Sequence, residues 1–145
     1  QTGNIPAFTA VNTGTSNLVA TFTVTPTGGD AKTFTITVYA RPAASVVASP
    51  ATICTGNTAT LTATTVSGIT TDWYTVATGG TPTVTGNNSM TTPVLRATTT
   101  TTTTTYYAEA RNTTTGCKSA ARTAVTVTVS PCVAPVNPRQ RVRTN

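Results

Sequence analysis

The chain of 145 residues contains no histidine and only three acidic residues, Asp30, Asp72 and Glu109. General acid–base catalysis needs titratable groups within reach of one substrate, and metal sites need clustered histidine, cysteine or carboxylate ligands. The three carboxylates and the three cysteines are scattered along the chain and form no such cluster in the sequence. We therefore expect that the protein is not an enzyme, and we expect no catalytic residue, no cofactor and no metal site, calcium included.

Charged residues make up only 8% of the chain, and apolar residues 37%. This is too little charge for a disordered polyelectrolyte, and no apolar run approaches the roughly 18 residues that a membrane-spanning helix needs. We expect no membrane insertion, and the absence of a signal peptide fits a mature, processed or partial chain. Threonine takes the place of the missing charges, because its β-branched side chain favours strands while its hydroxyl keeps their surface soluble. The composition indicates an all-β extracellular protein.

The net charge of +6 is not arranged as a nucleic-acid surface. Three of the nine basic residues, Arg139, Arg141 and Arg143, lie in the last seven positions, and the others are scattered singly. Nucleic-acid-binding proteins gather their basic residues in patches or stripes interleaved with aromatic residues. We expect no nucleic-acid partner and a solvated basic tail.

Strict alternation of threonine with apolar residues predicts half-buried antiparallel strands. The clearest segments are residues 18–25, 33–39, 58–64, 105–110 and 123–129, and a further short strand is expected at residues 7–11. Turn sequences rich in glycine and asparagine separate them. A run of eight threonines at residues 98–105 leads directly into the strand at 105–110. We interpret its last residues as the beginning of that strand, and a disordered tether is the alternative.

Four sequence elements follow one another in a specific order between about residues 46 and 129. Cys54 and Gly56 precede a Leu-centred strand, and "WYTVATGG" follows at residues 73–80. A Thr-Tyr-Tyr strand at residues 105–107 then leads to "GCKSAAR" at residues 116–122. In this combination and spacing the chain resembles the Ig-like repeats of very large secreted adhesins of the Bacteroidota, including proteins of the gliding-motility adhesin type. The resemblance implies a spacer or adhesive module.

The beginning of the chain is similar to the second half of a PKD-like domain from the same proteins, on the evidence of residues 3–29 and "KTFTITV" at 32–38. We expect all-β architecture with tandem antiparallel β-sandwich modules, the first one incomplete. The expected parts are a partial PKD-like unit at residues 1–41, an Ig-like β-sandwich at residues 42–130, and a Pro-rich linker or basic tail at residues 131–145.

Alternation also divides the aromatic and aliphatic residues of the second module between two faces. With Trp73 on a central strand, we expect the core of the sandwich to contain Leu61, Trp73, Tyr106, Val125 and Val127. Tyr74 and Tyr107 point the other way, so we expect them to be exposed aromatics that can bind a sugar. A sugar-stacking platform that includes Trp73 is the alternative for that residue.

The three cysteines leave the disulfide open. The resemblance implies a Cys54–Cys117 bond, which leaves Cys132 for an intermolecular bond or as an unpaired thiol. A plain Ig strand order would instead place Cys54 and Cys117 at opposite ends of the sandwich and Cys132 nearer to Cys54. We favour Cys54–Cys117, and the alternatives are Cys54–Cys132 and no bond.

The first unit has an apolar face with nothing in its own segment to cover it. This strand-complementation face consists of Phe22, Val24, Phe34, Ile36 and Val38. At ~25 cal/mol per Å2, leaving these side chains in water forfeits on the order of several kcal/mol, and the free edges would template strand addition. We expect completion by a strand from a neighbouring chain, which would give a head-to-tail filament, or by docking on the second module. Simple truncation with mobile residues 1–40 is the rival interpretation.

The leading functional hypothesis is a non-catalytic structural or adhesive module of an extracellular adhesin or filament. Its expected partners are neighbouring copies or modules of the same protein, with surface glycans as a further class. The alternative is a carbohydrate-binding accessory module of a secreted polysaccharide-degrading enzyme, which would need Tyr74 and Tyr107 on one platform. A third class, ice binding, would use flat threonine arrays such as Thr33, Thr35 and Thr37.

Overall fold

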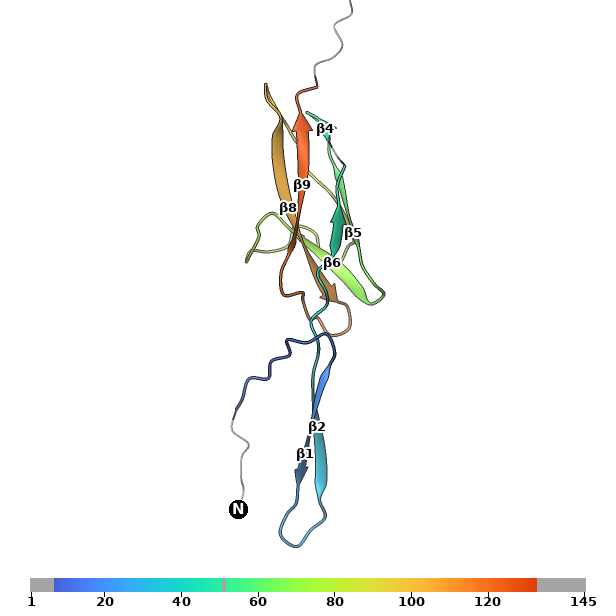
Figure 1. Ribbon diagram of the computed structural model, residues 1–145, viewed down its shortest axis with the longest axis vertical. Coiled ribbons are helices and arrows are strands. Elements are labelled where there is room, and N and C mark those ends of the chain that lie inside the picture. The colour runs from blue at the N-terminus through green and yellow to red at the C-terminus, as the bar shows by residue number, and fades with distance from the viewer. Residues whose placement is uncertain (1–6, 51, 133–145) are drawn as a thin grey trace, which may run out of the picture.

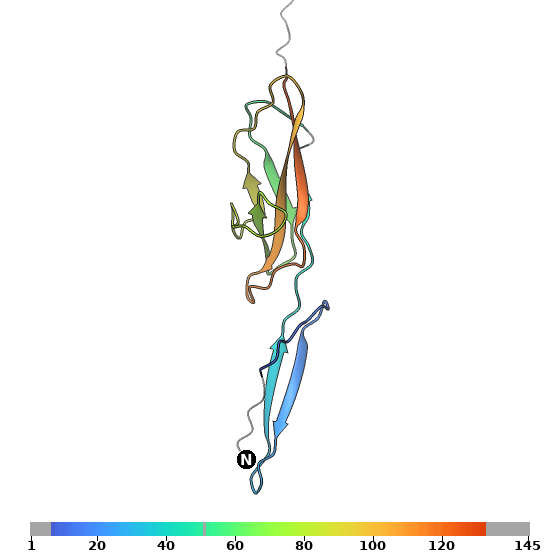
Figure 2. The ribbon, with the colours of Figure 1, turned by 90° about the vertical axis from the view of Figure 1, so that its left-hand side faces the viewer.

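The computed structural model describes residues 7–50 and 52–132, and all regular structure in these residues is β-strand. A two-stranded hairpin lies at one end of an elongated molecule and the other strands form a body at the other end (Figures 1 and 2). The strands are β1 (Leu18–Val24), β2 (Lys32–Val38), β3 (Val46–Ala48), β4 (Ile53–Cys54), β5 (Thr60–Thr64), β6 (Ile69–Tyr74), β7 (Ser89–Thr91), β8 (Thr102–Asn112) and β9 (Thr123–Ser130). The predicted all-β class is confirmed.

Two sheets pack face to face in the body and form a β-sandwich. The three-stranded sheet has the order β3–β5–β7, and the four-stranded sheet has the order β4–β9–β8–β6. Alternation turns every second side chain of β5, β8 and β9 toward the space between the sheets. The five residues expected in the core are all buried there: Leu61, Trp73, Tyr106, Val125 and Val127. Ala59, Ala63 and Met90 fill the core from the side of the three-stranded sheet.

Trp73 lies on β6, which is an edge strand of its sheet and not the central strand that the sequence suggested. The residue is nevertheless fully buried, because the chain returns to cover this edge. The backbone N–H of Trp73 donates to Val84 O at 2.8 Å, and Thr83 N–H donates to Trp73 O at 2.7 Å. The indole N–H donates to Asn87 O at 2.8 Å, which gives the buried ring the acceptor it needs.

The threonine run belongs to the sandwich. Its last four residues, 102–105, are the first residues of β8 and pair with β9, while residues 98–101 approach as an irregular segment. Thr103 lies opposite Thr128, and Thr105 lies opposite Thr126 with their hydroxyl oxygens 3.3 Å apart. Threonine therefore forms the solvent side of the same strands whose other side holds Tyr106 and the core valines.

In the hairpin β1 pairs with β2, and neither strand pairs with any other described strand. Phe22 lies opposite Phe34, Ala20 opposite Ile36 and Leu18 opposite Val38, while Val24 lies opposite Lys32. One face is therefore largely apolar, and the other carries mainly threonine. The strand expected at residues 7–11 does not form. A strand needs the backbone of a partner, and no described strand pairs with this segment.

Asn12 fixes the segment before β1 to the end of β2. Its side chain is only 6% exposed. Nδ2 donates to Ser16 O at 2.8 Å and to Val38 O at 2.9 Å, and Oδ1 accepts a hydrogen bond from Gly14 N–H at 2.9 Å. The amide group thus makes three hydrogen bonds, and it holds this turn against the hairpin.

The linker from the hairpin to the sandwich is short and is anchored at both ends. At the hairpin end, Ala40 N–H donates to Asn17 Oδ1 at 2.9 Å. At the sandwich end, Ser45 is buried: its hydroxyl lies 3.3 Å from that of Thr71, and Thr123 Oγ1 donates to Ser45 O at 2.9 Å. Only the four residues 41–44 lie between the two anchors.

Candidate functional site

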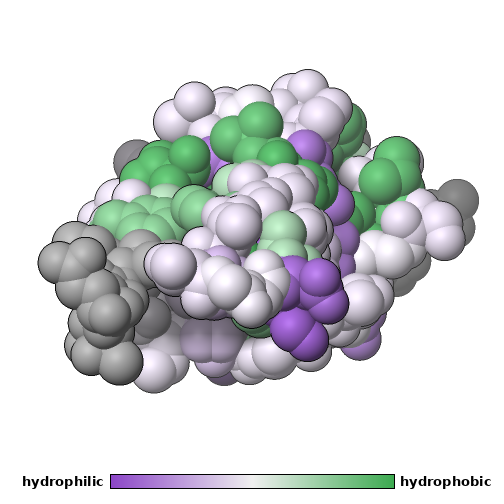
Figure 3. All heavy atoms as spheres, turned by 90° about the horizontal axis from the view of Figure 1, so that it is seen from below, coloured by the Kyte–Doolittle hydropathy of each residue, from purple (hydrophilic) through white to green (hydrophobic). Residues whose placement is uncertain are grey.

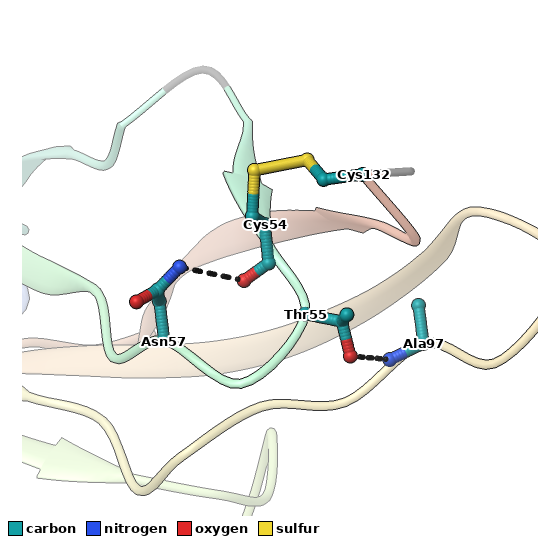
Figure 4. Close-up of a disulfide and its surroundings, with 5 residues drawn as sticks. All are labelled: Cys54, Thr55, Asn57, Ala97 and Cys132. Carbon is teal, nitrogen blue, oxygen red and sulfur yellow. Dashed lines mark hydrogen bonds between the residues drawn. A yellow bond between two sulfur atoms is a disulfide. The ribbon is translucent and has the colours of Figure 1, made fainter. Parts of the chain in front are cut away.

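A disulfide joins Cys54 to Cys132, with the two Cα atoms 5.3 Å apart (Figure 4). Cys117 is a free and partly buried thiol. The prediction of a Cys54–Cys117 bond is therefore wrong, and so is the expectation that Cys132 is unpaired or bonded to another chain. The alternative pairing, which followed from a plain Ig strand order, is the one in the structure.

Parallel pairing of β4 with β9 decides which cysteines meet. Cys54 lies opposite Ser130 at the end of β9, and Thr55 N–H donates to Ser130 O at 2.8 Å, so Cys132 leaves the sheet directly beside Cys54. Cys117 precedes β9 and lies toward its other end. The eight residues of β9 span about 26 Å at roughly 3.3 Å per residue, far beyond the ~7 Å between Cα atoms that a disulfide tolerates.

The loop after β4 is fixed by polar contacts around the disulfide, as Figure 4 shows. Asn57 Nδ2 donates to Cys54 O at 3.3 Å, and Ala97 N–H donates to Thr55 Oγ1 at 2.9 Å. The Ala97 hydrogen bond and the disulfide thus join this loop to two segments that are distant from it in sequence.

Tyr74 is not the exposed aromatic that the alternation predicted, since it is only 1% exposed. The guanidinium carbon of Arg122 lies 3.3 Å from the centroid of its ring. The Tyr74 hydroxyl donates to Glu109 Oε2 at 2.7 Å and accepts a hydrogen bond from Lys118 Nζ at 2.9 Å. Both ring face and hydroxyl are thus occupied within the protein. Tyr107 is half-buried opposite Tyr74, and a sugar platform built from the two tyrosines is not present.

Arg122 also fixes the loop that follows β6. Its Nη1 donates to Val76 O at 2.8 Å and to Gly79 O at 2.9 Å. At Gly80 the backbone has a φ of +67°, and a Cβ there would lie 2.9 Å from Val76 Cγ2, so this loop requires glycine. The elements "WYTVATGG" and "GCKSAAR" are therefore two sides of one contact. This contact explains why they occur together.

Asp72 lies on the same outer face of β6 and is 2% exposed. Arg111 Nε donates to its Oδ2 at 3.0 Å, and Gly86 N–H donates to its Oδ1 at 2.8 Å. Lys118 Nζ lies 3.8 Å from Oδ2. A buried carboxylate is stable only with such partners, and here both oxygens have them.

Glu109 completes this ion-pair network, with Lys118 Nζ 2.7 Å from Oε2 and Arg122 Nε 3.6 Å from Oε1. Burial alone would raise the pKa of Glu109, but hydrogen bonds from Lys118 and Tyr74 and the charges of Lys118 and Arg122 lower it below its ordinary value. The hydrogen bonds to Glu109 and Tyr74 in turn raise the pKa of Lys118. Both side chains therefore hold their charge at neutral pH, which suits an ion pair that stabilises the fold.

Sequence reasoning missed this network. Asp72, Tyr74, Glu109 and Arg111 occupy alternate, outward positions of two paired strands, and this spacing is the one signal that could have grouped them. Lys118 and Arg122 come from the connection between β8 and β9, whose path no periodicity reveals.

The predicted strand-complementation face lies in water. Phe22, Val24, Phe34, Ile36 and Val38 share one side of the hairpin. Val24 is 50% exposed, Phe34 57% and Ile36 40%, and the other two are half-buried. Seen from the hairpin end, the surface carries several apolar patches among pale, weakly polar residues (Figure 3). The face does not dock on the sandwich, so that expected mode of completion is wrong.

A hollow of about 890 Å3 lies where the hairpin segment meets the sandwich. Residues 11–15, 41–46 and 64–66 supply most of its lining. Its side chains are mainly aliphatic, and Arg41 is the one charged residue among them. None of the three acidic residues of the chain lines it. The hollow therefore has no carboxylate that could take part in acid–base chemistry.

Two further properties concern residues 7–50 and 52–132 only. In these residues no three histidine, cysteine or carboxylate side chains gather closely enough to hold a metal ion. They also form no helix that is long and apolar enough to cross a membrane. Of the expected tail at residues 131–145, everything from residue 133 onward, including Arg139, Arg141 and Arg143, lies outside the described part of the chain.

The sequence of residues 42–131 matches a protein family described as Ig-like domain, CHU_C associated. No match to the chain is found among curated proteins. The matched range contains both sheets of the sandwich, the ion-pair network around Tyr74 and Cys54, and it ends one residue before Cys132. Because the match covers more than half of the chain, the protein belongs to this family of Ig-like domains.

Proposed function

We propose that this chain is a non-catalytic structural or adhesive module of an extracellular protein, and that a neighbouring polypeptide completes its hairpin. The observation that carries the proposal is the contrast within one chain. A disulfide-bonded Ig-like sandwich is joined by a short, anchored linker to a hairpin whose apolar face is in water. Exposed apolar faces and unpaired strand edges are typical of surfaces that bind another protein.

Several observations support a structural role. Asp72 and Glu109 are both held in ion pairs that stabilise the sandwich. The disulfide fits an oxidising compartment, such as the outside of the cell. Membership of an Ig-like family fits a building block whose function lies in its length, rigidity and surface contacts.

The finer proposal is a repeat of a cell-surface adhesin or filament of the Bacteroidota gliding-motility type. In it, residues 1–41 belong to a partial PKD-like unit and residues 42–130 form the Ig-like module. Its partners are neighbouring copies or modules of the same protein. The resemblance of the sequence elements supports this, and so does the position of the hairpin at one end of an elongated molecule (Figure 1).

Hydrogen exchange tests the proposal, with the backbone amides of residues 33–39 as the readout. In the assembled parent protein or on the cell surface, completion of the hairpin predicts strong protection of these amides, comparable with that of β8 in the same sample. In a Phe34→Lys variant the protection should be lost over 33–39 and kept over β8. Fast exchange over 33–39 in the native assembly would contradict completion.

A further inference from the structure

The outer edge of β2 is open to pairing with another strand. β2 has seven residues, contains no proline, and its one charged residue, Lys32, stands at its end. Its regular register with β1 contains no bulge, and its other edge pairs with no described strand. Natural edge strands are usually kept short or blocked by charge, proline or a bulge. The hairpin also projects from the sandwich (Figure 2).

Two opposite charges flank this edge. Asp30 lies just before β2 and Arg41 just after it, and both are exposed. The ion pairs among the described residues involve neither of them. Asp30 is thus the acidic residue that the network of the sandwich does not use.

We propose that β2 pairs antiparallel with β2 of a second copy of this chain, about a two-fold axis at Thr35. This inference rests on the proposed function, since it names the neighbouring polypeptide and the edge that it occupies. In this register Thr35 faces its own counterpart, Phe34 lies opposite Ile36, and Lys32 lies opposite Val38. Phe22, Val24, Phe34, Ile36 and Val38 of both copies then share one face of the joined four-stranded sheet, as strand pairing requires, while Val19 lies on the threonine face.

Strand length and side-chain alternation select this register, and the charges agree with it. Thr35 is the middle residue of β2, so all seven residues pair, whereas a shift by two would leave two residues of each strand unpaired. A shift by one residue would place apolar residues opposite threonines on both strands. In the proposed register Asp30 lies one position from the residue opposite Arg41 of the second copy, and this happens twice because the pair is symmetric. Both residues lie beyond the strand ends, where the alternation no longer fixes the side, and the long arginine side chain spans the offset. The two Lys32 residues stay apart by about 20 Å, at roughly 3.3 Å per residue.

The seam adds two kinds of contact. First, the backbone N–H and C=O groups of β2 that point away from β1 gain hydrogen-bond partners. Second, Phe34 lies beside Ile36 of the second copy at two equivalent places, and such aromatic–aliphatic pairs are favourable in sheets. Because the strands run antiparallel, the two hairpins meet in the middle and the two sandwiches lie at opposite ends. The pair is therefore closed, and a longer filament would need a second interface.

Cysteine crosslinking tests the register in the whole chain, with Cys117→Ser as the background so that no native free thiol takes part. Thr35 lies on the threonine face, and in the proposed register its Cα is about 5 Å from that of its counterpart, within disulfide range. Thr35→Cys should form a covalent dimer on mild oxidation. Thr33→Cys is the matched control: it faces Thr37, its counterpart is about 13 Å away, and it should stay monomeric. Equal crosslinking of both variants, or of neither, overturns the proposal.

Sedimentation of the uncrosslinked chain supplies the second measurement. Asp30→Arg and Arg41→Asp should each weaken the dimer by roughly tenfold, and the double variant should restore it, since two exposed ion pairs are reversed together. A monomeric wild-type chain overturns self-pairing. If amides 33–39 remain protected in the parent assembly while the isolated chain is monomeric, another strand completes the hairpin, and the proposed function survives without this inference.

Discussion

The hairpin β1–β2 and the strand pair β8–β9 follow the same sequence rule with opposite outcomes. Both alternate threonine with apolar residues, and both pair antiparallel. Val127 is fully buried, whereas Phe34 is 57% exposed. The difference is the second sheet: β5 and β7 cover β8 and β9, while no described strand covers the hairpin. Alternation therefore determines which side of a strand is apolar, and residues distant in sequence determine whether that side is buried.

The two regions should also differ in stability. An isolated two-stranded hairpin is at best marginally stable in water, whereas two packed sheets unfold cooperatively. The hairpin of this chain has additional support at its base from hydrogen bonds of the Asn12 and Asn17 side chains. Substitutions of comparable size in the two regions should therefore have very different costs.

The largest expected effect comes from the core. Trp73→Ala removes a fully buried indole and the hydrogen bond to Asn87 O, and it should lower the free energy of unfolding by about 3–5 kcal/mol. Phe34→Ala, the counterpart in the hairpin, should change it by less than about 1 kcal/mol in dilute protein, because half of that ring is already in water. Urea unfolding followed by tyrosine fluorescence and circular dichroism measures both. Equal costs would mean that the hairpin face is covered in the monomer.

The disulfide gives the next effect. Cys132→Ser opens a bond between residues 78 positions apart, and it should destabilise the sandwich by about 2–4 kcal/mol through the entropy gained by the unfolded chain. Cys117→Ser is the control and should leave the unfolding midpoint nearly unchanged, since this thiol is free. Peptide mapping without reduction should recover a linked peptide pair containing Cys54 and Cys132. A loss of stability confined to the Cys117 variant would contradict the assignment.

Much of the sandwich could be predicted from its sequence, because long alternating segments carry a strong local signal. The threonine run and the strand around Tyr106 are an example: Tyr106 is buried as predicted, and Ala108 and Ala110, at alternate positions of the same strand, are buried with it. The short strands β3, β4 and β7, with two or three residues each, have too few residues for a period to show. Their existence depends on partners elsewhere in the chain.

The errors share one physical cause. Tyr74 was predicted to be exposed because it alternates with Trp73, but Lys118 and Arg122 from a distant connection cover it. The disulfide was assigned by resemblance, and the parallel pairing of β4 with β9 overrides it. In both cases a contact between segments distant in sequence decided the environment, and neither alternation nor resemblance showed that contact.

A smaller loss of stability should follow from replacing Arg122, which covers the ring of Tyr74. Arg122→Met keeps an apolar stem over the Tyr74 ring but removes the guanidinium and its hydrogen bonds to Val76 O and Gly79 O. We expect a loss of about 1–2 kcal/mol in the free energy of unfolding, with an altered near-ultraviolet circular dichroism of the tyrosines. Arg41→Met, which removes the same charge from the linker, is the control and should leave both quantities nearly unchanged in dilute protein. If Arg122→Met changed neither the free energy of unfolding nor the circular dichroism, other contacts would hold the loop that follows β6.

The smallest effect is a dependence on pH that only the sandwich should show. Because the pKa of Glu109 is lower in the folded chain than in the unfolded one, its carboxylate contributes stability at neutral pH, and this contribution is lost as the pH falls through the folded-state value. Glu109→Gln should therefore be less stable than the wild type near pH 7, and the difference should shrink steadily with acidification. Added salt should also reduce this difference in stability, because Lys118 is partly exposed and its ion pair is screened. Asp30→Asn removes the same charge from the hairpin and serves as the matched control. The measurement is the urea unfolding midpoint of the three proteins between pH 7 and pH 3. If the difference in midpoint between Glu109→Gln and the wild type were constant or grew toward low pH, the ion pairs of Glu109 would not stabilise the fold.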